Sequence, residues 1–184
     1  IPARAGIIPD RPSIASPLQK GEGGGAAFCG VFVDDMPQTI LTRIVNYGLQ
    51  YVQLSGSEQP VMIDNLRRTL IPDFVPEIKV IKSLKVNEAA DLQRWRDYEG
   101  LADYLMFKVC RVQGDAAFDW SLLSAYDGPI PFLLGGDIRP GDAGEIRQFS
   151  HPQLAGYNLN IRFEDEPAVK SVGKIREFLE GVNH

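Results

Sequence analysis

Lys108 is the side chain whose position most invites a chemical interpretation. It stands near the end of the apolar run ADYLMFKV (102–109), which predicts a buried strand, and after a loop the run FDWSLLSAY (118–126) predicts a helix. In enzymes built from alternating strands and helices, the tip of such a strand often carries a catalytic acid. A lysine there is normally charged, and it exchanges protons near neutral pH only when burial or a second cation lowers its pKa. Three roles are open for Lys108: a point charge for an anion, a proton donor, or a stem lying along the strand without a role.

The cysteines and histidines are too few and too scattered for a metal site or a disulfide framework. Cys29 and Cys110 form no C-x-x-C pair, and His151 and His184 are the two histidines. We therefore predict no metal, and we interpret Cys29 as a small thiol that is at least half-buried. Cys110 lies two residues after Lys108, but no histidine near it in the sequence would activate the thiol.

The composition is that of an ordinary globular domain with a mild negative charge. The 184 residues are 44% hydrophobic, and 19 basic against 24 acidic side chains give a net charge of -5. Nucleic acids and anionic membranes bind basic surfaces, so neither is expected as a partner, although a local cationic pocket for a phosphate is compatible with this charge. No run approaches the roughly 18 apolar residues of a membrane span. We expect one cytoplasmic domain.

Apolar runs alternate with segments of helical periodicity along the whole chain. The predicted strands, including one extended piece at the start, are 5–9, 30–33, 51–56, 78–84, 102–109, 130–136 and 155–163. The predicted helices are 36–49, 58–70, 87–98, 118–126, 140–149 and 169–182. Gly48 suits a helix end, and Asn87 suits a helix start.

This alternation implies right-handed βαβ units and a parallel sheet. About seven strand–helix units emerge, close to the eight of a TIM barrel. An open doubly wound sheet is the alternative, but no G-x-G-x-x-G follows the first strand to bind a dinucleotide. The run KGEGGG (20–25) lacks the G-K-S/T ending of a phosphate-binding loop, and we interpret it as a flexible loop.

Six stretches in this order carry a resemblance to a known family. They are GVFVDD, GLQYVQLSGSEQP, VIKSLKV, FDWSLL, PFLLGGDIRPGDA and LNIRFEDEPAVKSVGKIREFL. They resemble phosphoribosylanthranilate isomerase of tryptophan biosynthesis, whose versions read like GVFVN, GLDxVQLHGxE, VIKAF, FDWSLL, PxxLxGGIxP and a tail with P-x-x-K-D. The resemblance implies an α/β fold of the TIM (β/α)8 type, whose first βα unit we expect to lie outside the given sequence. Residues 1–184 would then be a single barrel domain that is incomplete at its N-terminus.

The resemblance also implies a reaction. It is the Amadori rearrangement of the aminoaldose N-(5-phosphoribosyl)anthranilate to an aminoketose, without cofactor or metal. A general acid protonates the ring oxygen and opens the furanose, and a general base then takes the C2 proton from the iminium. The expected partner is a phosphorylated small molecule. Family members include monomers and dimers, so a homodimer is compatible with the resemblance.

The family's acid and base are not intact in this chain. The base is a cysteine in a K-I/V-C-G motif on the first strand; the motif has no counterpart here, and we expect it outside the given sequence. The acid belongs to an F-D-T motif that reads Phe107-Lys108-Val109. The glycine-rich stretch that follows in the family reads RVQGDAA (111–117). Asp119, in the next stretch, is expected to cap a helix start.

The family's phosphate site, formed by the loops after the last two strands, is partly kept. Four matching residues are predicted phosphate ligands: Gly135, Gly136, Asn160 and Arg162. Asp137 stands where a further glycine is expected, and there it would strain a backbone of positive φ and repel phosphate. Arg162 is the best candidate for an anion contact, and the alternative is an ion pair with Glu164 or Asp165.

Two further basic residues are candidates for binding the anionic ligand. Arg11 stands two residues before Ser13, which replaces the arginine of the family's S-P-R segment. Lys82 matches the lysine of the family's VIKAF stretch. Strand alternation puts Lys82 on the side of Val80 and Leu84, where it either reaches the barrel mouth or packs its stem outward.

The departures from the family pattern gather at the ends of strands, where barrel enzymes carry function, whereas the packing positions follow it. They are Ser13, Ser55, Lys108, Asp137, Asn158 and Ile161. We therefore predict an isomerase-type protein that is impaired or inactive. The alternatives are a non-catalytic or regulatory module that binds a phosphorylated ligand, and a Schiff-base lyase using Lys82 or Lys108.

Overall fold

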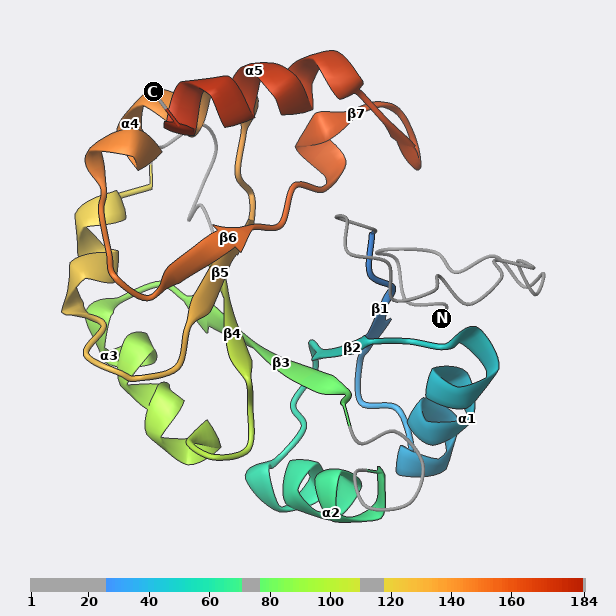
Figure 1. The fold of residues 1–184 in the computed structure, drawn as a ribbon. Helices are drawn as coiled ribbons and strands as arrows, with labels where there is room; N and C mark the ends of the chain where they lie inside the picture. The colour runs from blue at the N-terminus through green and yellow to red at the C-terminus, as the bar shows by residue number, and fades with distance from the viewer. Residues whose placement is uncertain (1–25, 71–76, 110–117, 184) are drawn as a thin grey trace. The chain divides into compact units, whose positions relative to one another are not determined.

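The computed structural model describes three stretches of the chain, residues 26–70, 77–109 and 118–183 (Figure 1). Several features singled out in the sequence lie outside the described residues: Arg11, Ser13, Cys110, His184, the runs 5–9 and 20–25, and the loop 111–117. The roles predicted for these residues stay predictions.

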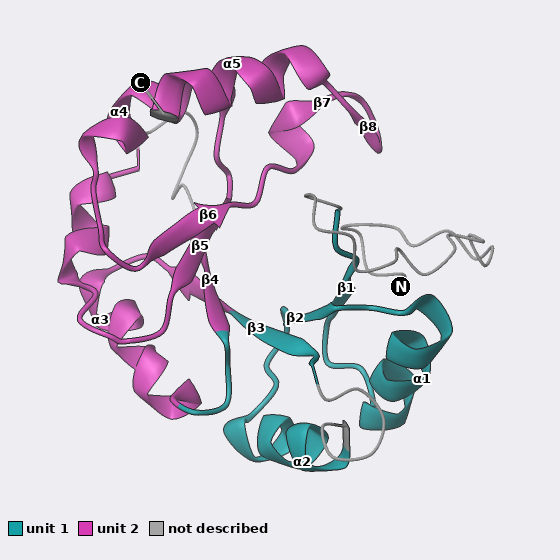
Figure 2. Ribbon diagram, viewed as in Figure 1, with its two compact units in different colours: residues 1–82, 100–103 teal, residues 83–99, 104–184 magenta. Residues whose placement is uncertain are grey.

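The described chain forms two compact units (Figure 2). Unit 1 contains the described residues up to Lys82 together with Gly100–Asp103. Unit 2 contains Ser83–Glu99 and the described residues from Tyr104 onward.

Six strands follow one another in the sheet in the order of the sequence, β1-β2-β3-β4-β5-β6. They are β1 (Cys29–Phe32), β2 (Tyr51–Leu54), β3 (Lys79–Val86), β4 (Tyr104–Val109), β5 (Phe132–Gly136) and β6 (Leu154–Tyr157). The pairs β1–β2, β2–β3, β4–β5 and β5–β6 are parallel. A doubly wound sheet reverses its strand order at a switch point, and the described strands do not. The sequential order is the one that a barrel requires.

The helices of unit 1 are α1 (Pro37–Tyr47) and α2 (Pro60–Leu70). Pro37 suits the first turn of α1, because the amide hydrogen that it lacks would have no partner within the helix. Ile40 and Ile44 fall on one face and are buried. Gly48 ends the helix in the left-handed conformation at φ 58°, and its N–H donates to the carbonyl of Ile44. The predicted helix 36–49 is therefore confirmed, with its stop signal.

The helices of unit 2 are shorter than predicted. They are α3 (Ala89–Leu92), the 3-10 helices η1 (Gln93–Tyr98), η2 (Trp120–Ala125), η3 (Pro140–Asp142) and η4 (Ile161–Phe163), and the α-helices α4 (Ala143–Gln148) and α5 (Val172–Asn183). The buried residues Trp120 and Leu123 of η2 and the buried C-cap Tyr126 recur every third position, which suits the three residues per turn of a 3-10 helix. Asp119 caps η2 as predicted, because its carboxylate accepts from Ser121 N at 3.0 Å.

Two further predictions for unit 2 are wrong. The N-cap of α3 is Glu88, not Asn87. The Asp91 carboxylate accepts from the backbone N–H of Glu88 at 3.2 Å and from that of Asn87 at 2.8 Å. The helix predicted over 169–182 begins only at Val172, because an antiparallel hairpin precedes α5. The hairpin consists of β7 (Glu164–Glu166) and β8 (Val169–Lys170).

An aromatic cluster anchors β4 and β5 in unit 2. The Phe107 ring lies 4.9 Å from that of Phe132 and 5.1 Å from that of Tyr126, centroid to centroid. The Tyr126 hydroxyl donates to the carbonyl of Ile130 at 2.7 Å, and burial raises the pKa of this tyrosine to about 12. His151 contacts the Tyr126 carbonyl through Nε2 at 3.0 Å. This packing fixes the strand that carries Lys108.

Two kinds of feature are absent from the described residues. None of the helices found there is both long enough and apolar enough to cross a membrane. No group of three or more His, Cys, Asp or Glu side chains gathers there in a way that could hold a metal ion.

Replacing Ala168, in the turn of the β7–β8 hairpin, by glycine should stabilise the protein. Its φ of 67° is costly for a residue with a Cβ atom. Ala168→Gly should therefore raise the free energy of unfolding by about 0.5 kcal/mol, since part of the gain is offset by the greater freedom of glycine in the unfolded chain. Urea-induced unfolding measures this change. Ala168→Val should act in the opposite direction, and equal stability of the two variants would contradict the argument.

Candidate functional site

Polar side chains gather after the carboxyl ends of the strands, and each unit has its own group. In barrel enzymes this end of the sheet carries the chemistry. In unit 2 these side chains are Lys108 near the end of β4, Asp137 after β5, and Asn160 and Arg162 after β6. The group in unit 1 follows β1 and β2 and includes Lys82 of β3.

Lys108 is the penultimate residue of β4, opposite Gly135 of β5 in the parallel register. Its neighbours Phe107 and Val109 are buried, whereas Lys108 itself is half-buried. The end of the strand is the position predicted for it. Its part in proton transfer or anion binding stays a prediction.

Gly135 and Gly136 have steric reasons to be glycine. A Cβ on Gly135 would lie 2.8 Å from the Met106 sulfur, and a Cβ on Gly136 would collide with the carbonyl oxygen of Val109. Gly136 also has a φ of 91°. The predicted strain at Asp137 is therefore wrong, because Gly136 takes the positive φ, and Asp137 is not among the residues with positive φ. The contribution of the two glycines to phosphate binding is untested.

Arg162 pairs with Asp137, and not with either acidic residue expected from the sequence. Its Nε donates to Asp137 Oδ1 at 2.7 Å. Glu164 instead pairs with Lys170 at 2.7 Å, and Asp165 with Lys174 at 3.0 Å. The hydrogen bond from Arg162 is the main cause that lowers the pKa of Asp137 below its ordinary value. Asp137 is therefore a carboxylate at neutral pH.

Asn160 precedes η4, and its Oδ1 accepts from Lys170 Nζ at 3.0 Å. Lys170 in turn donates to Glu164, and this hydrogen bond is the main cause that lowers the pKa of the Glu164 carboxyl. The backbone N–H of Asn158 donates to the carbonyl of Leu134 at 2.6 Å, which continues the β5–β6 ladder. The tail thus supplies Asn160 with a cationic partner from the protein, while its predicted contact to phosphate is untested.

Lys82 and Glu58 form a fully buried ion pair in unit 1. Lys82 Nζ lies 2.7 Å from Glu58 Oε2, and the two side chains are 2% and 1% exposed. The same ammonium donates to the carbonyl of Gly56 at 2.8 Å. Lys82 was predicted to bind the anionic ligand, but the structure gives it two partners within the protein.

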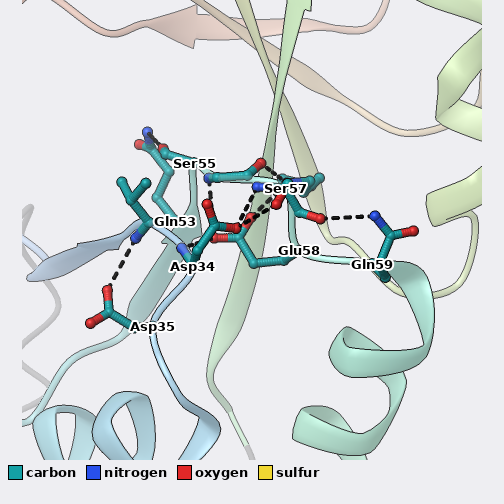
Figure 3. A network of polar contacts seen from close by, with 10 residues as sticks. Asp34, Asp35, Gln53, Ser55, Ser57, Glu58 and Gln59 are labelled. Atoms are coloured by element: carbon teal, nitrogen blue, oxygen red, sulfur yellow. Dashed lines mark hydrogen bonds and ion pairs between the residues drawn. The ribbon is translucent and has the colours of Figure 1, made fainter.

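Glu58, the partner of Lys82, is the residue of this network that the sequence analysis did not identify. Its Oε1 accepts from the backbone N–H groups of Asp34, at 3.0 Å, and Gly56, at 3.1 Å. Figure 3 shows Glu58 among the residues that follow β1 and β2. The signal was available: a lysine inside an apolar strand needs an acidic partner, and Glu58 closes the SGSE segment after the neighbouring strand.

Asp34 completes this network. It has a φ of 54°, and its Oδ1 accepts from both Ser57 N, at 2.6 Å, and Ser57 Oγ, at 2.8 Å (Figure 3). The hydrogen bond from the Ser57 side chain is the largest cause that lowers the pKa of Asp34. A Cβ on Gly56 would lie 2.5 Å from Asp34 Oδ1, so only glycine fits there. Ser55, at a predicted departure from the family, accepts from Gln53 Nε2 at 2.9 Å.

Cys29 has the properties expected of an unreactive thiol. It is half-buried in β1, and burial raises its pKa to about 11. The thiolate is the nucleophilic form, and it is scarce at neutral pH when the pKa is this high. Cys29 is therefore a poor candidate for a general base.

Known proteins are similar to this chain in sequence. A profile of the family described as N-(5'phosphoribosyl)anthranilate (PRA) isomerase matches residues 15–181. The N-(5'-phosphoribosyl)anthranilate isomerase of Parabacteroides distasonis is 37% identical over 158 residues, which cover 84% of this chain and 68% of that protein. This chain belongs to the phosphoribosylanthranilate isomerase family. The isomerase of Phocaeicola vulgatus is also 37% identical, over 82% of this chain and 71% of that protein.

Solved structures of phosphoribosylanthranilate isomerases have the same fold. That from Thermus thermophilus superposes with a TM-score of 0.68 at 24% identity, covering 88% of this chain and 74% of that chain. A phosphoribosylanthranilate isomerase in complex with reduced 1-(o-carboxyphenylamino)-1-deoxyribulose 5-phosphate has a TM-score of 0.65 at 22% identity, covering 85% and 71%. These proteins are of the TIM-barrel type, so the predicted fold class is confirmed.

Breaking the buried Lys82–Glu58 pair should lower the free energy of unfolding far more than breaking the exposed pair of Lys79 on the same strand. Lys82→Met leaves the Glu58 carboxylate buried without its cation and should lower the free energy of unfolding by about 3–5 kcal/mol. Lys79→Met is the matched control, because Lys79 is 51% exposed and lies 3.2 Å from Asp103. It should cost less than about 1 kcal/mol.

Urea-induced unfolding of the single variants and of Lys82→Met/Glu58→Gln measures the coupling. The double variant should be less destabilised than the sum of Lys82→Met and Glu58→Gln, because neither charge is then left alone. Equal costs for Lys82→Met and Lys79→Met would contradict the burial argument.

Proposed function

We propose that this chain is a phosphoribosylanthranilate isomerase-type protein whose turnover is impaired at the step that needs a proton donor. Its membership of the family supports the isomerase function in tryptophan biosynthesis. The observation that carries the impairment is Lys108, which stands near the end of β4 where the family has its acid. The proposal involves no cofactor and no metal.

The chemistry explains why a lysine is a poor substitute. Opening the sugar ring requires a proton on the ring oxygen as its bond to C1 breaks. A general acid works best when its pKa lies near the working pH, and a carboxylic acid reaches that range when its pKa is raised. An ordinary ammonium group, with a pKa of about 10.4, is a weak acid. It stabilises negative charge nearby but transfers its proton reluctantly.

The ligand that we propose is a phosphorylated amino sugar. A relative has been solved with a reduced carboxyphenylamino-deoxyribulose 5-phosphate. The predicted phosphate ligands lie at the carboxyl ends of β5 and β6 in unit 2, which supports the assignment: Gly135 and Gly136 end β5, and Asn160 and Arg162 follow β6. Direct contacts from Arg11 and Lys82 remain predictions. A homodimer also remains a prediction.

The second candidate is a non-catalytic module that binds the phosphorylated ligand. Basic groups persist at the strand ends of unit 2, where Arg139 and Arg162 both approach Asp137, although the position of the acid carries Lys108. A protein that keeps its anion contacts without its proton donor would bind and not turn over. The two candidates differ in their response to restoring a carboxylate at residue 108.

Lys108→Asp should raise kcat/KM for N-(5'-phosphoribosyl)anthranilate by about 10²-fold or more, since a positioned general acid contributes 10²–10⁴-fold. Lys108→Asn is the matched control, because it has the size of aspartate without the ionisable group. Fluorescence assays of the isomerisation measure all three proteins.

Two outcomes would change the conclusion. A kcat/KM of the unsubstituted protein within the range of about 10⁴–10⁸ M⁻¹s⁻¹ found for ordinary enzymes would contradict the impairment. Binding of the substrate analogue with no gain from Lys108→Asp over Lys108→Asn would favour the non-catalytic module.

A further inference from the structure

Asp137 lies between the guanidinium groups of two arginines in unit 2. Its Oδ1 accepts from Arg162 Nε at 2.7 Å, and its Oδ2 lies 3.4 Å from a terminal nitrogen of Arg139. Arg139 comes two residues later, at the start of η3, whereas Arg162 belongs to η4 beyond the following strand. Each oxygen of the carboxylate therefore faces a different arginine.

The contact with Arg162 uses one of the groups through which a guanidinium binds phosphate. A guanidinium binds phosphate most strongly through two parallel N–H groups. Asp137 occupies Nε, one of the N–H groups through which the planar guanidinium makes such bidentate contacts. A phosphate that approaches Arg162 therefore meets a position already filled by a carboxylate of the protein.

The pair is exposed enough to open. The Arg162 side chain is 50% exposed, and that of Asp137 is 26% exposed. Ion pairs at such exposure are weak, because water competes with both partners. A phosphate can therefore displace the carboxylate. Its apparent affinity falls in proportion to the fraction of time that Arg162 is available.

We propose that Asp137 is an internal competitor for Arg162 and so sets how tightly unit 2 binds a phosphate group. The inference rests on the phosphorylated ligand of the proposed function and is independent of turnover at Lys108. Removing the charge of Asp137 should strengthen phosphate binding, and the gain should require Arg162. Because Asp137 is a carboxylate at neutral pH, the competition is always present under physiological conditions.

Sulfate is the probe for the test, because it is a dianion across the working pH range. Calorimetric titration at low ionic strength should give Asp137→Asn about threefold to tenfold tighter sulfate binding than the unsubstituted protein, since the amide keeps the shape and removes the charge. Asp165→Asn is the matched control. It removes the same charge from an exposed ion pair with Lys174 in the same unit, and it should change the affinity less than about twofold.

Arg162→Gln should abolish the gain when it is combined with Asp137→Asn. Equal or weaker binding by Asp137→Asn, or no binding by any variant, overturns the proposal. A gain that persists without Arg162, or that Asp165→Asn reproduces, overturns it as well. Thermal unfolding verifies the fold of each variant. In the unsubstituted protein, a sulfate titration should also shift the NMR signal of Arg162 Nε–H, and an unchanged signal at saturation would contradict the proposal without any substitution.

The two proposals can fail separately. An isomerase that gains activity from Lys108→Asp while Asp137→Asn leaves sulfate binding unchanged refutes only the competition. Tighter sulfate binding by Asp137→Asn in a protein with ordinary turnover refutes only the impairment.

Discussion

A buried ammonium group requires a buried counter-charge, and the strand ends of unit 1 are arranged around that requirement. Removing Lys82 and Glu58 from water costs several kcal/mol for each ion, and the attraction between them offsets this cost only when their remaining donors and acceptors are also satisfied. Glu58 meets the condition by accepting from Lys82 and from the backbone of Asp34 and Gly56. One side chain thus holds the residues that follow β1 and β2 against β3. The glycine at 56 and the unusual φ of Asp34 are consequences of that geometry.

The charged side chains of unit 2 also pair with oppositely charged or polar side chains, but these contacts lie at the surface. Arg162 donates to Asp137, and Lys170 donates to Asn160 and Glu164. Groups that the family resemblance predicts to face a ligand thus have partners within the chain as well. The difference between the units lies in burial, because an exposed pair is weak and exchangeable whereas a buried pair is part of the framework. Ligand binding is therefore compatible with the charges of unit 2, whereas Lys82 is part of the framework of unit 1 and its contact with a ligand stays a prediction.

Local patterns were sufficient to predict most of the framework. The apolar runs predicted the six described strands, although the run 155–163 is too long because β6 ends at Tyr157 and η4 follows. Ile40, Ile44 and Gly48 predicted a helix with its end. The family resemblance added the fold class and the position of Lys108. Two failures concern contacts between residues distant in sequence: the pairing of Asp137 with Arg162, and the role of Glu58. Hydrophobic periodicity carries no information on which charge meets which, because that depends on how loops from different strands are brought together. The 3-10 helix η2 was missed for another reason, since its short apolar run fits both helix types.

The strand order has a consequence for how the protein is made. Because β1 to β6 follow one another in the sheet as they do in the sequence, each strand pairs with the one synthesised just before it. A chain emerging from the ribosome can therefore extend its sheet stepwise, without waiting for a distant segment to complete an earlier pair. Contacts between sequence neighbours also keep the entropic cost of loop closure low at each step. The order that suits a barrel is thus also an order that suits vectorial synthesis.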